Sequence, residues 1–131
     1  MIALVETTAG AFAVDLETDD VTPWDDAVDA PLPPALNLPL LVAAAAAGST
    51  VFAVVDTTPP IVVSHDAGMT WRASGRGLPA GAAIGVFDDD PDLAVYAARN
   101  RLYVTRDGGV FWTALALELP EITAVRVTAS I

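Results

Sequence analysis

Ser64-His65-Asp66-Ala67-Gly68-Met69-Thr70-Trp71 is the stretch that decides the fold, because it recurs as Thr105-Arg106-Asp107-Gly108-Gly109-Val110-Phe111-Trp112. The two aspartates are 107 − 66 = 41 residues apart, and the two tryptophans are 112 − 71 = 41 residues apart. A spacing of about 40 residues is typical of repeated four-stranded β units. The sequence therefore predicts, as its first inference, an architecture of repeated four-stranded units.

Each copy of the motif fits a β-hairpin turn that is closed by its own side chains. The aspartate can accept hydrogen bonds from backbone amides across the turn. The glycine two positions later supplies the freedom that a positive φ requires, and the leading hydroxyl can add a further hydrogen bond. The closing tryptophan can cover the turn and bury about 150–250 Å². We interpret eight residues as structural for this reason: Ser64, Asp66, Gly68, Trp71, Thr105, Asp107, Gly109 and Trp112.

Short β-branched and aromatic runs between Gly, Pro and Asp predict an all-β chain without a helix. The alanine-rich stretch 40–47 has helical propensity, but it is short and stands where the repeat requires a strand. Residues 27–39 contain Pro31, Pro33, Pro34 and Pro39, so we expect a long loop there and a candidate interface element. The expected strands are 2–7, 11–17, 21–26, 40–47, 51–56, 61–64, 70–73, 82–87, 93–98, 101–105, 111–114 and 122–129.

These strands group into units of four. The second unit spans 40–73 and the third spans 82–114, each with its motif between the last two strands. The first unit, 1–26, lacks one strand and carries only a decayed motif, in which Trp24 is expected to take the place of Trp71 and Trp112. Residues 4–8 support this alignment because they echo residues 54–58.

The two motifs resemble the Asp-box, also called the BNR repeat, with its pattern Ser/Thr-x-Asp-x-Gly-x-x-Trp. The flanking segments 90–97 and 101–103 are also similar to those of the family, and the resemblance covers residues 40–131 well and 1–26 loosely. It implies a β-propeller of four-stranded blades, as in sialidases, xyloglucan-degrading glycosidases, sortilin-type receptor domains and photosystem assembly factors. In that family the Asp-box is structural and lies away from the active site.

Three units are too few for a propeller, which typically has 4–8 blades. The first unit lacks a strand, and 122–130 is a surplus strand at the other end of the chain. We therefore expect a homodimer with two-fold symmetry and a six-bladed ring, in which each C-terminal strand completes the first blade of the partner. The alternative is a piece of a longer propeller. We favour a natural half-ring, because the sequence starts with Met1 and its last predicted strand fits the order of strands in the repeat.

The family's ligand face, opposite the Asp-boxes, is expected to carry Arg76, Arg99 and Arg101. A sialidase-like site also needs a tyrosine paired with a glutamate, and neither Tyr96 nor Tyr103 has a glutamate placed beside it. We interpret the three arginines as rim residues that pair with the abundant acids. They remain a candidate ligand rim.

Three further positions have structural interpretations. Arg126 shares a predicted strand face with Ile122 and Ala124, so we expect it to be partly buried in an ion pair. His65 stands at a variable position of the motif and is expected to be exposed. The acidic turn 88–92 lacks the oxygen spacing of an EF-hand loop and is interpreted as solvated.

The composition narrows the class of protein. Seventeen acidic residues against six arginines give a net charge of −11, which repels nucleic acid. There is no cysteine and only one histidine, so no metal or cofactor is expected. No signal peptide and no membrane span is recognised, which predicts a cytoplasmic protein.

The sequence therefore predicts a non-catalytic binding or scaffold protein with an unidentified glycan or peptide ligand. The alternative is a glycosidase-like or sialidase-like hydrolase with a site assembled across the dimer axis. A third reading is an assembly factor or receptor fragment that binds a peptide at the rim.

Overall fold

The apolar runs of the sequence form strands throughout, and the computed structural model, which describes residues 1–129, contains no helix in that range. Its twelve strands make three four-stranded antiparallel sheets. The predicted all-β class is thus confirmed, including the alanine-rich strand at 41–47, which pairs along its length with the next strand.

Each sheet is named by its place along the chain. The first sheet has the order β12-β1-β2-β3, the second β4-β5-β6-β7, and the third β11-β10-β9-β8. Their strands are β1 (Ile2–Thr7), β2 (Gly10–Asp15), β3 (Val21–Trp24) and β12 (Ile122–Thr128); β4 (Leu41–Ala47), β5 (Thr50–Val55), β6 (Ile61–Ser64) and β7 (Arg72–Ser74); and β8 (Ala83–Phe87), β9 (Asp90–Ala98), β10 (Arg101–Thr105) and β11 (Thr113–Ala114).

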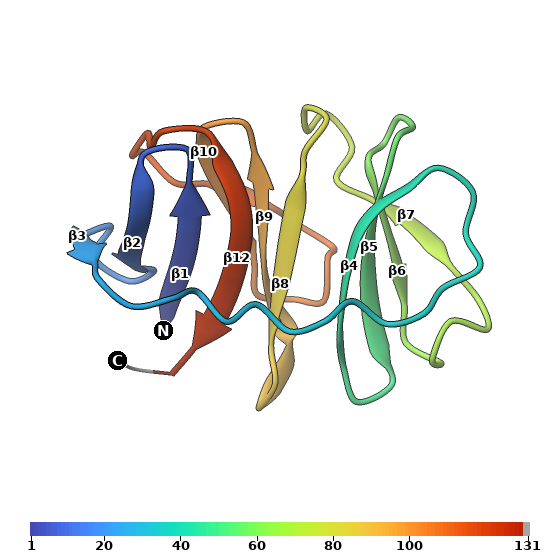
Figure 1. The fold of residues 1–131 in the computed structure, drawn as a ribbon. Coiled ribbons are helices and arrows are strands. Elements are labelled where there is room, and N and C mark those ends of the chain that lie inside the picture. Colours follow the sequence, from blue (N-terminus) through green and yellow to red (C-terminus); the bar gives the residue numbers. More distant parts are fainter. Residues whose placement is uncertain (130–131) are drawn as a thin grey trace.

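The three sheets stand side by side, with the third in the middle (Figure 1). Strand β8, at one edge of the third sheet, packs against the edge strand β12 of the first sheet on one side and against the edge strand β4 of the second sheet on the other. We call β12, β8 and β4 the inner strands. The first and second sheets therefore lie at opposite ends of the array, although they are neighbours along the chain. Gly85 allows the close approach of β8 to β12, because a Cβ there would lie 3.1 Å from the carbonyl oxygen of Val125.

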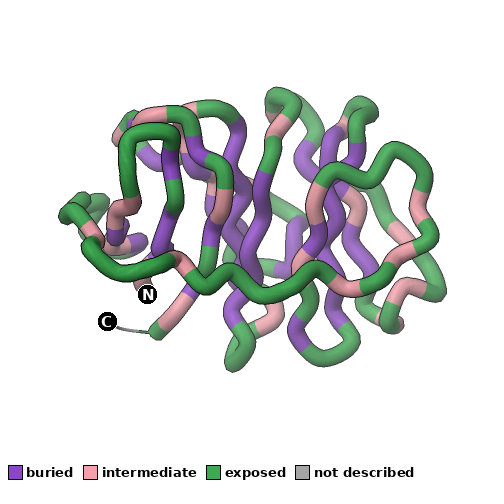
Figure 2. The backbone as a smooth tube through the Cα atoms, viewed as in Figure 1, coloured by how far each residue is buried: buried purple, intermediate pink, exposed green. Residues whose placement is uncertain are grey.

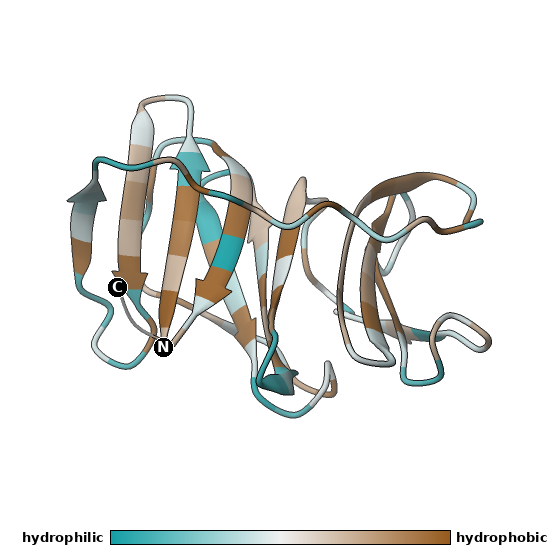
Figure 3. Cartoon of the chain, turned by 60° about the horizontal axis from the view of Figure 1, so that its bottom comes forward, coloured by the Kyte–Doolittle hydropathy of each residue, from teal (hydrophilic) through white to brown (hydrophobic). Residues whose placement is uncertain are grey.

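Two hydrophobic cores fill the spaces between the sheets. One lies between the first and third sheets and includes Val5, Val14 and Val95; the other lies between the second and third sheets and includes Phe52 and Tyr96. Figure 2 shows the buried positions concentrated on the strands, and Figure 3 shows the hydrophilic residues gathered mainly at the turns. Face-to-face packing of sheets is thus the main source of stability.

The C-terminal strand differs from the sequence-based expectation. β12 pairs antiparallel with β1 of the same chain, from Ile2 opposite Thr128 to Thr7 opposite Ile122, and so completes the first sheet internally. The expected exchange of this strand with a partner is therefore corrected, because the same ladder of hydrogen bonds forms within one chain. Residue 130, included in the expected strand, lies outside the described residues.

Trp24 also differs from the expectation. Trp24 is the last residue of β3 and pairs with Ala11. Its side chain lies on the same face of the first sheet as Leu4 and Ala13, and this face points away from the third sheet. Trp112, in contrast, precedes β11 and packs in the core between the second and third sheets. The decayed motif around 17–24 lacks the glycine, and Trp24 does not take the place of Trp71 and Trp112.

Some strand ends shift as well. The outer strands β7 and β11 begin at Arg72 and Thr113, after the tryptophans, and β9 begins at Asp90 within the predicted acidic turn. The register of β8 and β9 shifts between Val86 and Phe87. This bulge lets Phe87 pair with Asp90, the first residue of β9.

The long segment between β3 and β4, residues 25–40, forms no strand. It runs in front of the inner strands β12, β8 and β4, from one end of the array to the other (Figure 1). This linker, as we call it from here on, connects the two end sheets across the middle one.

Candidate functional site

The first motif, residues 64–71, folds into a turn that its own side chains hold. Ser64 Oγ donates to Asp66 Oδ1 at 2.7 Å and accepts from the Gly68 amide at 2.8 Å. Asp66 also accepts from the Thr70 amide at 2.8 Å and from the Thr70 hydroxyl at 2.6 Å. Gly68 has a φ of +90°, the conformation that favours glycine. The side chains of this motif thus satisfy one another.

The second motif, residues 105–112, repeats the main bonds of this network. Thr105 Oγ1 donates to Asp107 Oδ1 at 2.8 Å and accepts from the Gly109 amide at 2.9 Å. Asp107 accepts from the Val110 and Phe111 amides at 3.1 and 3.0 Å. Phe111 has no hydroxyl, so it cannot supply the bond that Thr70 gives to Asp66.

The hydrogen bonds stabilise the charged form of both aspartates. The bond from the Thr70 hydroxyl is the largest cause that lowers the pKa of Asp66 to about 2, followed by the Thr70 amide. The bond from the Phe111 amide is the largest cause that lowers the pKa of Asp107. Neither carboxyl group is therefore poised as a general acid or base near neutral pH.

The second motif also joins two sheets. The Ser74 hydroxyl at the end of β7 donates to the Gly109 carbonyl and accepts from Trp112 Nε1 at 2.8 Å. The Trp112 ring makes edge contacts with Phe52 of the second sheet and Tyr96 of the third. A Cβ at Gly109 would lie 3.0 Å from both Ser74 Oγ and Val63 Cγ2. The motif of the third sheet is thus locked against the second sheet.

Within the described part of the chain, no hydrogen bond joins the first motif to another sheet, although the His65 ring lies near Gly108. Met69 is 83% exposed, and a Cβ at Gly68 would meet only Trp71 of its own motif. Trp71 and Gly68 are half-buried, whereas Gly109 is buried. An open groove beside Trp71 is lined by Val63, His65, Asp66, Thr70, Trp71 and Arg72.

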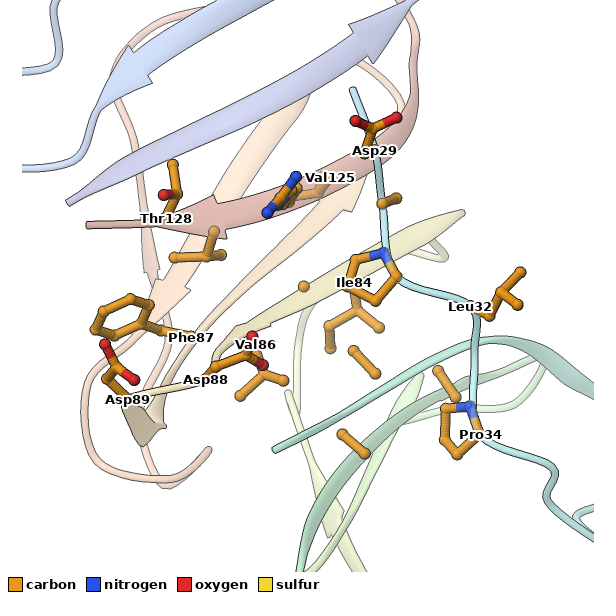
Figure 4. Close-up of a pocket in the computed structure, with 18 of the residues that line it drawn as sticks. Asp29, Leu32, Pro34, Ile84, Val86, Phe87, Asp88, Asp89, Val125 and Thr128 are labelled. Carbon is orange, nitrogen blue, oxygen red and sulfur yellow. The ribbon is translucent and has the colours of Figure 1, made fainter. Parts of the chain in front are cut away.

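A cavity of about 440 Å³ lies between the linker and the three inner strands. Its volume falls within the range of about 300–1,000 Å³ that is usual for ligand sites. Figure 4 shows Asp29 on the linker side and Asp88 and Asp89 at the turn that follows β8. The rest of the wall comes from Ala44–Ala46 on β4, Ile84–Phe87 on β8 and Val125–Val127 on β12, with Arg126 among them, and polar atoms line more of the cavity than apolar atoms do.

The position of Arg126 corrects its sequence-based prediction. It is exposed, lines the cavity and forms no ion pair with a described residue. The register of β12 shifts between Ala124 and Ile122, opposite Glu6 and Thr7. Because of this bulge, Ile122 turns into the core while Arg126 stays on the opposite face.

The three predicted rim arginines do not line this cavity. Arg101 pairs with Glu118 at 3.3 Å, so it has the acidic partner that the sequence analysis expected. Arg76 lines a separate hollow beside Gly109, and Arg99 lies in the turn between β9 and β10 with a φ of +58°. His65 is exposed as predicted, with Nδ1 3.3 Å from the Thr50 hydroxyl.

Tyr96 is fully buried and donates to the Pro79 carbonyl at 2.7 Å. Burial raises the pKa of Tyr96 to about 12, so its hydroxyl stays protonated at neutral pH and is poorly suited to act as a nucleophile. Residues 1–129 hold no cluster of three or more metal-ligating side chains.

Sequence reasoning missed two features. One is the cavity, whose only signal was the unusual length and proline content of the linker. The other is Trp24, whose Nε1 is buried and has no hydrogen-bond partner among residues 1–129.

Comparisons with known proteins leave the family open: the chain matches no family model, no curated protein and no solved structure. Within residues 1–129, no helix could cross a membrane.

Proposed function

We propose that this chain is a non-catalytic binding or scaffold protein, built as half of an Asp-box β-propeller whose ring is completed by a second copy. The observation that carries the proposal is the side-by-side packing of the three inner strands, β12, β8 and β4. Converging inner strands are the feature that propeller blades share, and the two hairpin motifs follow the Asp-box pattern.

The number of sheets supports a ring of two chains. Propellers typically have 4–8 blades, and six is the one multiple of three in that range. The first and second sheets stand at opposite ends of the array (Figure 1), so two copies can meet end to end with two-fold symmetry. No strand exchange is required, since β12 already completes the first sheet.

The cavity beneath the linker is the proposed ligand site. In such a ring the inner strands face the centre, so the cavity would open toward the channel. Its lining mixes apolar side chains with a larger share of polar atoms, including those of Arg126 and three aspartates, and so suits a glycan or a peptide that carries both apolar and polar groups.

A titration with sialyllactose, xyloglucan oligosaccharides and a set of short peptides tests this function. We expect one probe to shift the NMR signals of Ala44, Ala45 and Ala46 and to be recovered unchanged. Cleavage of a bound probe would contradict a non-catalytic role, as would binding that leaves these signals unmoved.

A glycosidase-like hydrolase is the second candidate, favoured by the carboxylates of Asp29, Asp88 and Asp89 at one cavity. Glycoside hydrolysis needs two carboxylates about 5–9.5 Å apart. Under this alternative, chromogenic glycosides would be hydrolysed by the wild-type chain, and Asp88→Asn or Asp89→Asn would abolish the activity.

A further inference from the structure

We propose that the linker is a contact surface between the two copies of the ring. Its uncharged segment 30–36 lies in the central channel and packs, around Leu32, against the same segment of the second copy. This inference rests on the proposed ring, and it identifies what fills the channel of that ring.

The linker crosses the side of the array that would face the channel. It passes in front of β12, β8 and β4, which become the innermost strands of the proposed ring (Figure 1). Residues 29–32 and Pro34 line the cavity together with these strands, so this part of the linker lies over them. A rotation about the channel axis leaves the height along that axis unchanged. The two linkers of a ring would therefore face each other across the axis.

The second half of the linker carries no charge, although the chain has seventeen acidic residues. No charged residue occurs between Asp29 and Asp56. Two copies with a net charge of −11 each repel one another, and the repulsion is least where the surfaces that meet are uncharged. A two-fold axis also runs the two linkers in opposite directions. Asp25, Asp26 and Asp29 of one linker then lie across from the uncharged half of the other.

Leu32 lies within this uncharged segment, between Pro31 and Pro33. It is 92% exposed, more than any other large hydrophobic side chain of residues 1–129. A single exposed leucine is ordinary on a protein surface. Here it stands on a segment that crosses the innermost strands, so the second copy is the surface that would cover it.

The backbone of this segment suits burial between two copies. Pro31, Pro33 and Pro34 have no N–H group, so Leu32 carries the only backbone donor of residues 31–34. Few donors therefore lose their water when the segment is covered. Prolines also restrict the chain before it binds, which lowers the entropy lost on contact. Residues 31–39 form no backbone hydrogen bond with the described residues, so the contact breaks none.

The contact leaves part of the cavity accessible. The cavity reaches from the linker to Asp88 and Asp89 at the turn that follows β8 (Figure 4). Two linkers that meet across the axis do not cover this turn, so a ligand can still enter from that end of the channel.

A single cysteine tests whether Leu32 lies near the two-fold axis, because only a residue near that axis can form a disulfide with its own copy. The chain has no cysteine, so Leu32→Cys introduces one thiol per copy. Phe111→Cys is the matched control, since Phe111 is 74% exposed and precedes β11, the outer strand of the third sheet. Sedimentation equilibrium of the wild-type chain over a dilution series gives the dimer dissociation constant. Both variants are then oxidised with copper phenanthroline and oxygen above that concentration.

We expect Leu32→Cys to give the disulfide-linked dimer roughly tenfold faster than Phe111→Cys or more, because its two thiols are held together within the dimer. Leu32→Ser should raise the dissociation constant roughly tenfold or more, because two leucines lose their contact in each dimer. Phe111→Ser should change the dissociation constant by no more than about twofold. Thermal unfolding at the lowest concentration should show no loss for Leu32→Ser, since this side chain is exposed in the single chain.

Two other outcomes overturn the inference and are distinguishable from each other. A wild-type dimer in which Leu32→Cys links no faster than Phe111→Cys would exclude the linker contact, while a ring closed through other surfaces survives. A wild-type chain that stays monomeric throughout the dilution series would exclude the ring itself, and with it this contact, and would leave the uncharged segment to a different partner.

Discussion

The two copies of the hairpin motif share their pattern and their turn but differ in what surrounds them. Gly68 and Gly109 have φ angles of +90° and +94°, and Ala67 and Gly108 have +58° and +72°. The second motif is nevertheless locked against the second sheet through Ser74, whereas the first motif stands open at the end of the array. The eight residues thus determine the turn, and the neighbouring sheet determines how much that turn contributes to stability.

The largest difference between the motifs is expected from alanine at their glycines. Both Gly68→Ala and Gly109→Ala place a side chain at positive φ, which costs about 1–3 kcal/mol. Gly109→Ala also forces Ser74 Oγ and Val63 to move, which adds about 1–3 kcal/mol. Urea denaturation should therefore show the greater loss for Gly109→Ala. Equal losses would mean that the second motif is not locked as described.

A smaller loss is expected from Ser74→Ala. This change removes the donor to the Gly109 carbonyl and leaves Trp112 Nε1 without its acceptor. The loss of stability should be about 1–3 kcal/mol. The control is Thr113→Ala on the exposed strand β11, which should stay within about 0.5 kcal/mol of wild type. If the two variants lose equally, the hydroxyl bridge does not hold the sheets together.

The smallest effect is a pH dependence that distinguishes Asp66 from Asp107. The folded-state pKa of Asp66 is lowered to about 2, below its value in an unfolded chain of about 3.9. Its stabilising contribution is therefore present above about pH 4 and is lost as the pH falls toward 2. Thr70→Ala should raise the pKa of Asp66 toward its ordinary value, and Phe111→Thr should lower that of Asp107 further. Carboxyl NMR titrations measure both shifts, and unchanged pKa values would show that the hydroxyl is not the cause.

The strands could largely be predicted from sequence because their signals are local. Turn residues and β-branched runs located all twelve, and the repeat identified the alanine-rich β4 as a strand against the helical propensity of alanine. The strand ends were less predictable. β7 and β11 begin later than expected because the motif turn continues through Trp71 and Trp112.

The features that the sequence did not predict depend on contacts between distant segments. The pattern of β12 fits the edge of β1 equally well in its own chain or in another, so sequence could not decide between them. The bulge opposite Glu6 and Thr7 puts Ile122 and Arg126 on opposite faces of β12, although they are four residues apart. The cavity requires the linker to cross three inner strands, which no local pattern specifies.

Cross-linking between two singly substituted chains tests most directly whether the open ends of two copies meet. The chain has no cysteine, so Asp26→Cys beside Trp24 and Met69→Cys in the first motif each introduce a unique thiol. Their counterparts inside the chain are Arg76 and Val110, which line one hollow and serve as the positive control when both are changed to cysteine.

A short bismaleimide added to the mixture of the two variants should give a covalent dimer that joins position 26 of one chain to position 69 of the other. Neither variant should give this dimer alone. A mixture that stays monomeric, under conditions in which the Arg76→Cys/Val110→Cys chain is linked internally, would contradict the account.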